Sequence, residues 1–264
     1  MSFDWTAPAR WARTAAYRTA SPIDNAWRRA AGRTPLPPLW LRRHAGDVRF
    51  FETAATETAA WIDRLGLLSG SRLVLDAGCG PGSMVEEFLK RLPVDGRYVG
   101  FDVHAPSIRW CRRRWAREPR ASFSLAQTQS PYGASRAPQT PYRFPVGDGE
   151  TDLVLAKSLF THLLEADARH YLSETRRALA PGRAAVITAF LFRADADGLE
   201  TAFPHTAGNA RVRSRARPSR AVAWEKERFV GMIEDAGLRL QWHSAGYYPG
   251  RPRLDAQDIL LLGH

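Results

Sequence analysis

The chain has 264 residues, of which 44% are hydrophobic, which is enough for one well-packed domain that can enclose a site. Its net charge of +11 and pI of about 10.4 favour an anionic partner, such as nucleic acid, a phosphorylated metabolite, a carrier protein or a membrane surface. It contains no apolar run of membrane-spanning length, no signal-peptide core and too few cysteines for a disulfide framework, so we expect a soluble cytoplasmic protein.

Residues 1–66 are predicted to form an N-terminal helical extension. Prolines at positions 35, 37 and 38 divide it, and a helix is predicted over residues 53–65, where Gly66 ends it. Five tryptophans are spread along this part of the chain: Trp5, Trp11, Trp27, Trp40 and Trp61. One interpretation is that they pack helices onto the edge of a sheet.

A strand, a glycine-rich turn and a helix follow in direct succession. Residues 73–76 form an apolar run typical of a buried parallel strand, which ends at Asp76. Gly78, Gly80 and Gly82 alternate through the turn, and a helix is predicted over residues 83–91. Because glycine lets the backbone approach a ligand closely, this arrangement predicts a nucleotide-type site. The third glycine arrives one residue too early for the dinucleotide-binding pattern, which argues against an NAD-dependent dehydrogenase.

An acidic residue follows the next predicted strand. Residues 97–101 form that strand, and Asp102 at its carboxyl end can accept both hydroxyls of a ribose. Together, residues 74–84 and 98–102 resemble the class I S-adenosylmethionine-dependent methyltransferases. The resemblance implies that S-adenosyl-L-methionine is the cofactor, that the glycine turn wraps its methionine part and that Asp102 holds its ribose. It places the cofactor contacts of this region at Asp76, Gly78, Cys79, Gly80, Gly82, Asp102 and Val103.

The rest of the chain alternates helices and strands, which predicts an α/β fold with a parallel sheet and right-handed crossovers. Helices are predicted over 106–117, 165–179 and 224–237, and strands over 122–125, 152–156, 184–189, 238–244 and 259–262, with a turn at 181–182. The resemblance implies a Rossmann-like doubly wound sheet of seven strands, mostly parallel with an antiparallel last strand, and helices on both faces. It makes residues 67–264 the methyltransferase domain, with a lid insertion at about 192–222 and residues 1–66 as an extension or lid.

The resemblance also covers the segment around the fourth predicted strand, where it assigns Lys157 to the cofactor. It departs after the third strand, where the family carries an acid that accepts from the adenine amino group. Gln127 stands in that region, and its side-chain carbonyl can accept the same hydrogen bond without the charge. The alternative is that Gln127 is an ordinary loop residue.

Two histidines are candidates for the general base that a hydroxyl acceptor requires. His162 follows the fourth predicted strand, and His205 lies in the insertion. The alternatives are a core or helix-start histidine for His162 and a solvated loop histidine for His205. Tyr247 and Tyr248 are candidates to line the acceptor pocket, and packing is the alternative. No cluster of His, Asp or Glu has metal-ligand spacing, so no metal is predicted.

The predicted function is methyl transfer from S-adenosylmethionine to a small-molecule acceptor, giving an O-methyl product in specialised or glycan metabolism, including natural product biosynthesis. The alternating arginines of residues 211–217 would form a positive stripe in an extended segment, so we expect the acceptor or its carrier to be anionic. One alternative is an RNA or protein methyltransferase, which the charge supports without any recognition motif. The other is a cofactor-binding scaffold without activity. The acceptor, the atom methylated and the oligomeric state stay open.

Overall fold

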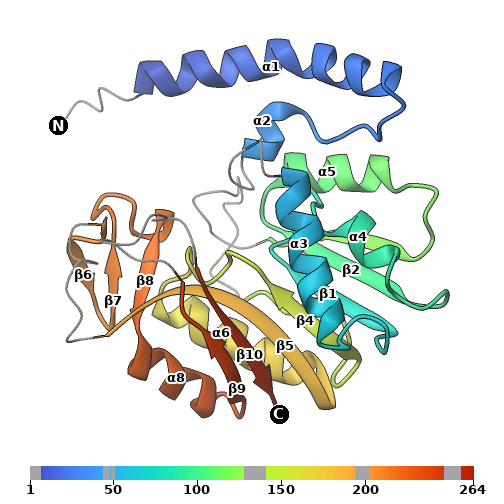
Figure 1. Cartoon of the computed structure of the whole chain (residues 1–264). Coiled ribbons are helices and arrows are strands. Elements are labelled where there is room, and N and C mark those ends of the chain that lie inside the picture. The colour runs from blue at the N-terminus through green and yellow to red at the C-terminus, as the bar shows by residue number, and fades with distance from the viewer. Residues whose placement is uncertain (1–6, 44–47, 49–50, 128–140, 194–201, 247–256) are drawn as a thin grey trace.

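The computed structural model describes residues 7–43, 48, 51–127, 141–193, 202–246 and 257–264. Its centre is the predicted sheet (Figure 1). The five parallel strands lie in the order β3-β2-β1-β4-β5, and β10 is antiparallel to both β5 and β9. Their bounds are β1 Leu73–Ala77, β2 Arg97–Asp102, β3 Ala121–Leu125, β4 Thr151–Ala156, β5 Leu179–Phe192, β9 Arg239–Ser244 and β10 Asp258–Gly263. This confirms the predicted α/β fold with its antiparallel last strand.

Helices cover both faces of the sheet. On one face lie α3 (Phe51–Arg64), α4 (Val85–Leu89) and α5 (Ala105–Arg114), and on the other α6 (Glu165–Ala178) and α8 (Lys226–Asp235). Successive strand residues therefore enter different cores: Val74 packs with the first group and Leu75 with the second. Because both faces are buried, the strands read as the continuous apolar runs from which they were predicted.

The region beyond β5 differs from the prediction. Residues 205–225, expected as lid and helix, add three strands to the sheet: β6 (His205–Ala207), β7 (Ala210–Val212) and β8 (Val222–Glu225). A 3₁₀ turn, η3 (Pro218–Arg220), lies between β7 and β8. The predicted helix over 224–237 accordingly begins at Lys226 and ends at Asp235, because Trp224 and Glu225 pair with β5 in parallel.

The fifth strand is longer than predicted, because the expected turn at residues 181–182 lies within it. Gly182 has a φ of 73°, and the register between β4 and β5 shifts between Thr151 and Leu153. An irregularity of this kind lets a strand continue past a glycine that would otherwise end it. The far end of β5, Phe190–Phe192, pairs with β8 and so joins the added strands to the main sheet.

The N-terminal helix α1 (Ala7–Ala30) lies apart from the sheet, as Figure 1 shows, and α2 (Leu39–Arg42) sits beneath it. The Asn25 side chain exchanges two hydrogen bonds of 3.1 Å with the backbone of Leu36. The buried Arg28 donates to Glu52 of α3 at 2.6 and 3.0 Å. Side-chain contacts of this kind hold α1 in place. None of the described helices has the length and hydropathy needed to cross a bilayer.

Candidate functional site

The turn after β1 is open to a ligand at its centre. Gly78, Gly80 and Gly82 have φ angles of 79°, 52° and 79°, a region that side chains other than glycine rarely adopt. A Cβ on Gly78 would lie 3.3 Å from Leu159, and one on Gly82 would lie 3.0 Å from the Cys111 sulfur. A Cβ on Gly80 would meet no protein atom within 4 Å. The turn is therefore packed at both ends and leaves space over Gly80.

Asp102 lies directly beside this turn. Its Oδ2 accepts from the Gly80 N–H at 2.8 Å, and its Oδ1 accepts from the His104 N–H at 2.7 Å. A carboxylate in this position has the acceptor chemistry that ribose hydroxyls require. The structure thus brings together the two segments on which the sequence prediction depends.

Val103 and Cys79, two further predicted cofactor contacts near the turn, differ in burial. Val103 is half-buried and packs against the core that contains Leu75. Cys79 is buried, and its thiol packs beside that of Cys111 under the turn, each sulfur 3.7 Å from the Gly80 carbonyl. A ligand over the turn would therefore meet the backbone of Cys79 and not its side chain.

Asp76 forms the floor of the turn. Its carboxyl is buried and accepts a hydrogen bond from the Tyr98 hydroxyl on β2. Burial raises the pKa of Asp76 to about 7, and the Asp102 charge adds to this, while the Tyr98 hydrogen bond and the Lys157 ammonium oppose it. Tyr98 is a site residue that the sequence analysis missed. The signal that could have identified it is a tyrosine in a buried strand, two residues before a glycine.

Lys157, at the carboxyl end of β4, reaches the N-terminal part of the chain. Its Nζ donates to Thr58 Oγ1 of α3 at 3.0 Å and to the Ala54 carbonyl at 3.5 Å. Burial lowers its pKa, and the charges of Asp76 and Glu57 oppose that effect. The lysine therefore connects α3 to the strand end that faces Asp76.

The turn after β4 has an unusual backbone. Ser158 has a φ of 59°, the one positive value outside glycine among the described residues. Its N–H donates to Thr188 Oγ1 at 2.7 Å, and its hydroxyl accepts from the Gln257 amide at 2.9 Å. Strained residues held by several partners are common at functional sites. Here they fix Lys157 and Leu159 on either side.

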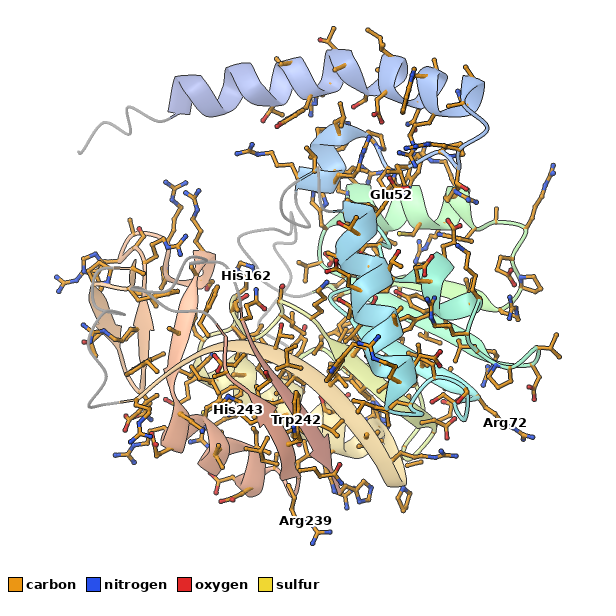
Figure 2. All side chains as sticks on the ribbon, viewed as in Figure 1. Glu52, Arg72, His162, Arg239, Trp242 and His243 are labelled. Atoms are coloured by element: carbon orange, nitrogen blue, oxygen red, sulfur yellow. The ribbon has the colours of Figure 1, made fainter. Side chains whose placement is uncertain are left out.

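His162 ends this turn and contacts the insertion. Its Nδ1 lies 3.1 Å from the Ser219 carbonyl, and the Val222 N–H donates to the Thr161 carbonyl at 2.8 Å. Burial lowers the pKa of His162, although its hydrogen bonds to the backbone of Ser219 and Arg220 act to raise it. Because this pKa lies below its ordinary value, the ring is neutral at pH 7. In Figure 2 it lies above the sheet, between the added strands and α3. The contact agrees with the packing interpretation and leaves the ring beside the β4 end.

The other predicted residues are spread more widely. Gln127 is exposed just past β3, and the preceding Ala126 N–H donates to the Asp102 carbonyl at 3.0 Å, which keeps this segment beside Asp102. His205 lies on β6, the last strand of the order, and pairs with Val212. The structure does not bring His205 together with β1 and β2. Tyr247 and Tyr248 lie outside the described residues.

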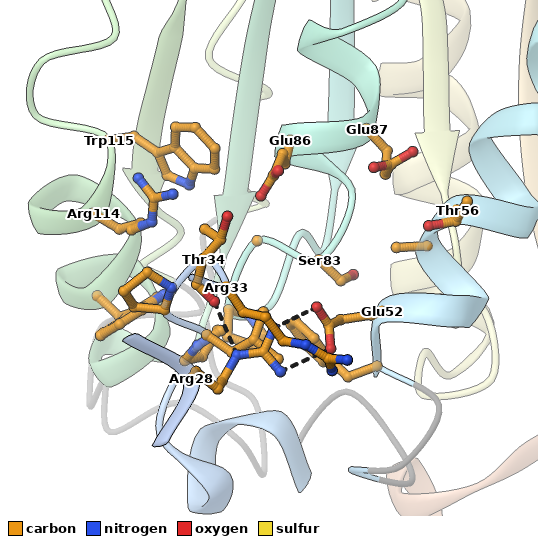
Figure 3. A pocket seen from close by; sticks show the side chains of 18 of the residues that line it. Arg28, Arg33, Thr34, Glu52, Thr56, Ser83, Glu86, Glu87, Arg114 and Trp115 are labelled. Atoms are coloured by element: carbon orange, nitrogen blue, oxygen red, sulfur yellow. Dashed lines mark hydrogen bonds and ion pairs between the residues drawn. The ribbon is translucent and has the colours of Figure 1, made fainter. Parts of the chain in front are cut away.

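A pocket of about 390 Å³ lies on the outer side of the glycine turn (Figure 3). The segment before α2, the start of α3 and the end of α5 enclose it, and Gly82 and Ser83 form one wall. Arg28 and Glu52 cross its floor as an ion pair. Asp76, Asp102 and Lys157 do not line it. The pocket is therefore separate from the candidate site and borders it only through the turn.

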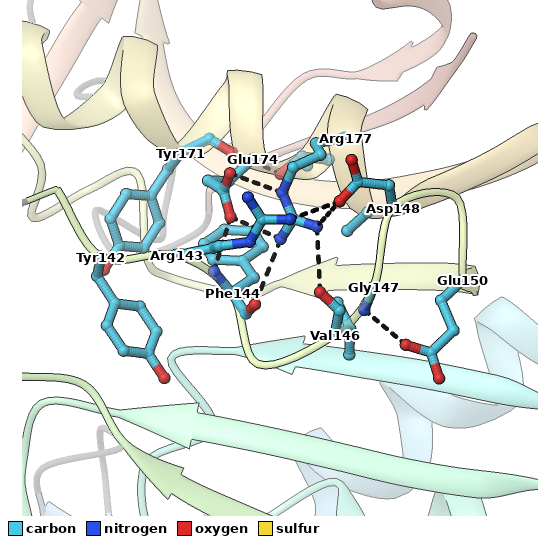
Figure 4. A network of polar contacts seen from close by, with 12 residues as sticks. Tyr142, Arg143, Phe144, Val146, Gly147, Asp148, Glu150, Tyr171, Glu174 and Arg177 are labelled. Atoms are coloured by element: carbon cyan, nitrogen blue, oxygen red, sulfur yellow. Dashed lines mark hydrogen bonds and ion pairs between the residues drawn. The ribbon is translucent and has the colours of Figure 1, made fainter.

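A polar network fixes the opposite end of β4 (Figure 4). Arg177 donates to both oxygens of Glu174 at 2.8 Å and to Asp148 at 2.7 Å. Burial acts to raise the pKa of Glu174. The hydrogen bonds from Arg177 and from the Phe144 N–H outweigh burial and hold this pKa below its ordinary value. The network lies before the first residue of β4 and is structural. Asp148 and Glu150 thus lie in the segment before β4, where they accept hydrogen bonds from a side chain and from the backbone, respectively.

Comparison with known proteins gives matches over the same region. Residues 74–182 match a family described as "Methyltransferase domain". The chain is 28% identical over 172 residues to an uncharacterised methyltransferase of Mycobacterium sp. (strain KMS), covering 63% of this chain and 60% of that protein. It is 25% identical over 170 residues to an uncharacterised 37.1 kDa protein of transposon TN4556 in Streptomyces fradiae, covering 56% and 45%. The chain thus spans only about half of the curated relatives that it matches.

Solved structures share the fold. The Burkholderia thailandensis 1,6-didemethyltoxoflavin N1-methyltransferase, solved with S-adenosylhomocysteine, aligns with a TM-score of 0.53 at 17% identity, covering 99% of this chain and 92% of that one. The mitomycin 7-O-methyltransferase MmcR aligns with a TM-score of 0.55 at 16% identity, covering 85% and 57%. At these identities the likeness concerns the fold.

Proposed function

We propose that this chain, whose residues 74–182 match a methyltransferase domain family, is a class I S-adenosylmethionine-dependent methyltransferase that transfers a methyl group from S-adenosylmethionine to a small-molecule acceptor. The observation that carries the proposal is the open glycine turn with Asp102 hydrogen-bonded to Gly80 at its side. A backbone cradle without side chains and a carboxylate directly beside it fit a nucleoside cofactor.

The residues around the turn have distinct roles in this proposal. Gly80 leaves room for the methionine part, Asp102 accepts from the ribose hydroxyls, and Gln127 accepts from the adenine amino group. The bound cofactor supplies a methyl group on a positively charged sulfur, which is already a good leaving group. The protein has to align an acceptor with that methyl group and exclude water.

The acceptor would lie at the carboxyl ends of β4 and β5, where ligands bind in such sheets. Ser158 and Lys157 are fixed there by their hydrogen bonds, and His162 is neutral at pH 7. We assign His162 as the general base for a hydroxyl acceptor. The product of such a reaction is an O-methyl compound, and we propose that it belongs to specialised or glycan metabolism. The mitomycin 7-O-methyltransferase and the toxoflavin-type N1-methyltransferase show that proteins of this fold methylate small molecules.

An anionic acceptor or carrier is part of the proposal. Arg213 stacks its guanidinium 5.3 Å from the Phe203 ring, and Arg211 donates to the Phe203 carbonyl at 3.0 Å. Arg213, Arg215 and Arg217 are exposed on the turn between β7 and β8. An exposed guanidinium cluster binds phosphate and carboxylate groups.

Calorimetric titration of the whole chain with S-adenosylhomocysteine tests the proposal. We expect binding, and we expect Asp102→Ala to weaken it at least about tenfold, since two ribose hydrogen bonds to a charged group are lost. Asp148→Ala is the matched control, because it removes an aspartate of the structural network at the other end of β4. A folded sample that binds neither S-adenosylmethionine nor its product would refute the proposal, and binding without turnover on any acceptor would favour the scaffold alternative.

A further inference from the structure

We propose that Tyr98 is a positioning residue whose hydroxyl holds the Asp76 carboxyl in the floor of the glycine turn, so that cofactor binding depends on the ionisation of Asp76. The inference rests on the proposed function, because it concerns the same cofactor. It adds a role for a residue of β2 to which the sequence analysis assigned none, and a pH dependence that the reaction itself does not require.

Packing fixes the direction of the Tyr98 side chain. The ring is fully buried, 6.2 Å from the ring of Phe88 in an edge-on contact and 6.0 Å from that of Phe123. Gly100, which faces the same side of β2, makes room for it: a Cβ there would lie 3.0 Å from Tyr98 Cε1. The ring cannot turn away from β1, and its hydroxyl is held on Asp76.

The Asp76 carboxyl has one side-chain hydrogen-bond partner in the described part of the chain, and that partner is Tyr98. The phenol stays neutral, because burial and the Asp76 charge raise its pKa well above its ordinary value. It can therefore donate to Asp76 throughout the physiological range. A donor of this kind favours the ionised carboxylate, which burial disfavours.

The charged and titratable groups facing Asp76 come from three directions, and they oppose one another. Asp102 and the Cys79 thiol lie on the turn side, Lys157 lies at the end of β4, and Glu57 of α3 acts on Lys157. Lys157 favours the ionised carboxylate and Asp102 disfavours it. This balance places the pKa of Asp76 at about 7, with burial as the largest cause.

The amino group of the cofactor's methionine part is positively charged, so it favours the ionised form of Asp76. Below the pKa of Asp76, binding must first release a proton, and the affinity falls up to about tenfold for each pH unit. Above it, no proton is released and the affinity levels off. Removing the Tyr98 hydroxyl removes support for the ionised form, so the transition should move to higher pH.

The experiment is calorimetric titration of the whole chain with S-adenosylhomocysteine between pH 5.5 and 8.5. For wild type we expect affinity to rise with pH and level off near 8. For Tyr98→Phe we expect the rise to shift upward by at least about half a pH unit, with near-wild-type affinity at the highest pH. Thr151→Val is the control, because it removes another buried hydroxyl, 2.8 Å from the Ala178 carbonyl at the opposite end of β4. A merely structural role for Tyr98 would weaken binding equally at every pH and would overturn the inference.

A second variant covers the case in which Tyr98→Phe does not fold. Asp76→Asn removes the titrating group, so the rise of affinity with pH that Asp76 causes should disappear. Urea unfolding without ligand gives an independent measurement. Because folding raises the pKa of Asp76 from 3.8 to about 7, its contribution to stability is present below pH 3.8 and is lost as the pH rises towards 7. Asp76→Asn should remove that loss. An unchanged pH profile in this variant contradicts the inference, whereas absence of binding by the wild-type chain at every pH contradicts the proposed function as well.

Discussion

Three glycines shape the turn after β1, and Gly80 is the one whose missing side chain leaves space for a ligand. It shares its geometry with Gly149, because both have positive φ, 52° and 60°, and a Cβ on either would meet no protein atom within 4 Å. Alanine at either position costs about 1 kcal/mol of folding free energy for the backbone conformation alone.

The two glycines therefore form a matched pair for a test. We expect Gly80→Ala to weaken S-adenosylhomocysteine binding about tenfold or more, about 1.4 kcal/mol, because its methyl group occupies the space of the cofactor. We expect Gly149→Ala to lose similar stability and no affinity. Calorimetry and urea unfolding measure the two effects separately, and equal affinities in the two variants would show that the space over Gly80 is not used.

For single residues, sequence patterns identify those whose role follows from the local backbone conformation. They miss residues whose role depends on how distant elements pack against one another. The glycine spacing and Asp102 could be read directly, because a tight turn and a strand end are local features. The Lys157–Thr58 bond joins positions 99 apart in sequence. The Tyr98–Asp76 bond depends on the register that sets Val74 opposite Tyr98. Neither α3 docking nor strand register follows from periodicity.

Among the elements, α1 is joined to the rest of the molecule by polar side chains. Arg28 is 5% exposed, donates to Thr34 and makes two hydrogen bonds to Glu52 of α3, as Figure 3 shows. A buried guanidinium with these partners is costly to remove, because its acceptors lose their donors. The attachment of α1 should therefore depend on this one residue more than on its exposed neighbours.

We expect Arg28→Met to loosen α1 while the sheet keeps its stability. Hydrogen exchange should become faster over residues 14–30, with little change in β1 and β4. Arg33→Met is the control, because Arg33 is exposed and only stacks on the Trp27 ring at 5.4 Å. Equal exchange in the two variants would mean that α1 is held by other contacts.

The elements with strong periodicity were predicted to within a few residues, and the short ones were missed. β6 and β7 have three residues each, which is too short for an alternation of apolar and polar side chains to be recognised as a strand. They form because the open end of β5 offers unpaired backbone groups to β8, which then pairs with β7. Such pairing is a tertiary effect. Trp61 supports the packing interpretation of its tryptophan set, since its ring lies 5.7 Å from that of Trp242 on β9.

For the whole molecule, the excess of positive charge is large enough to attract anions. The distribution of the arginines over the surface decides where an anion binds. The exposed arginines lie between β7 and β8 on the added strands, while Arg72 lies at the right and Arg239 at the bottom of the molecule in Figure 2. Two double variants with the same net charge can therefore separate local recognition from general attraction.

We expect Arg213→Glu with Arg215→Glu to raise the KM for an anionic acceptor at least about fivefold at low salt, and less at high salt. Arg72→Glu with Arg239→Glu should leave that KM nearly unchanged. The measurement compares phosphorylated and unphosphorylated forms of the same acceptor across salt concentrations. If both double variants respond alike, or if neither form responds, the acceptor is not recognised by the arginines of the insertion.

The length of β5 has a consequence for how a molecule could enter. The last residue of β4, Ala156, pairs with Ile187, so β5 continues past it and carries β8 on its final residues. The added strands beside the carboxyl end of β4 are thus joined to the sheet by backbone pairing. The N-terminal helices α1 to α3 are instead held by side-chain contacts, such as Lys157 with Thr58 of α3 and Arg28 of α1 with Glu52 of α3. Entry and exit of a ligand at this end of the sheet should consequently depend on movement of α1 to α3, while the added strands stay fixed.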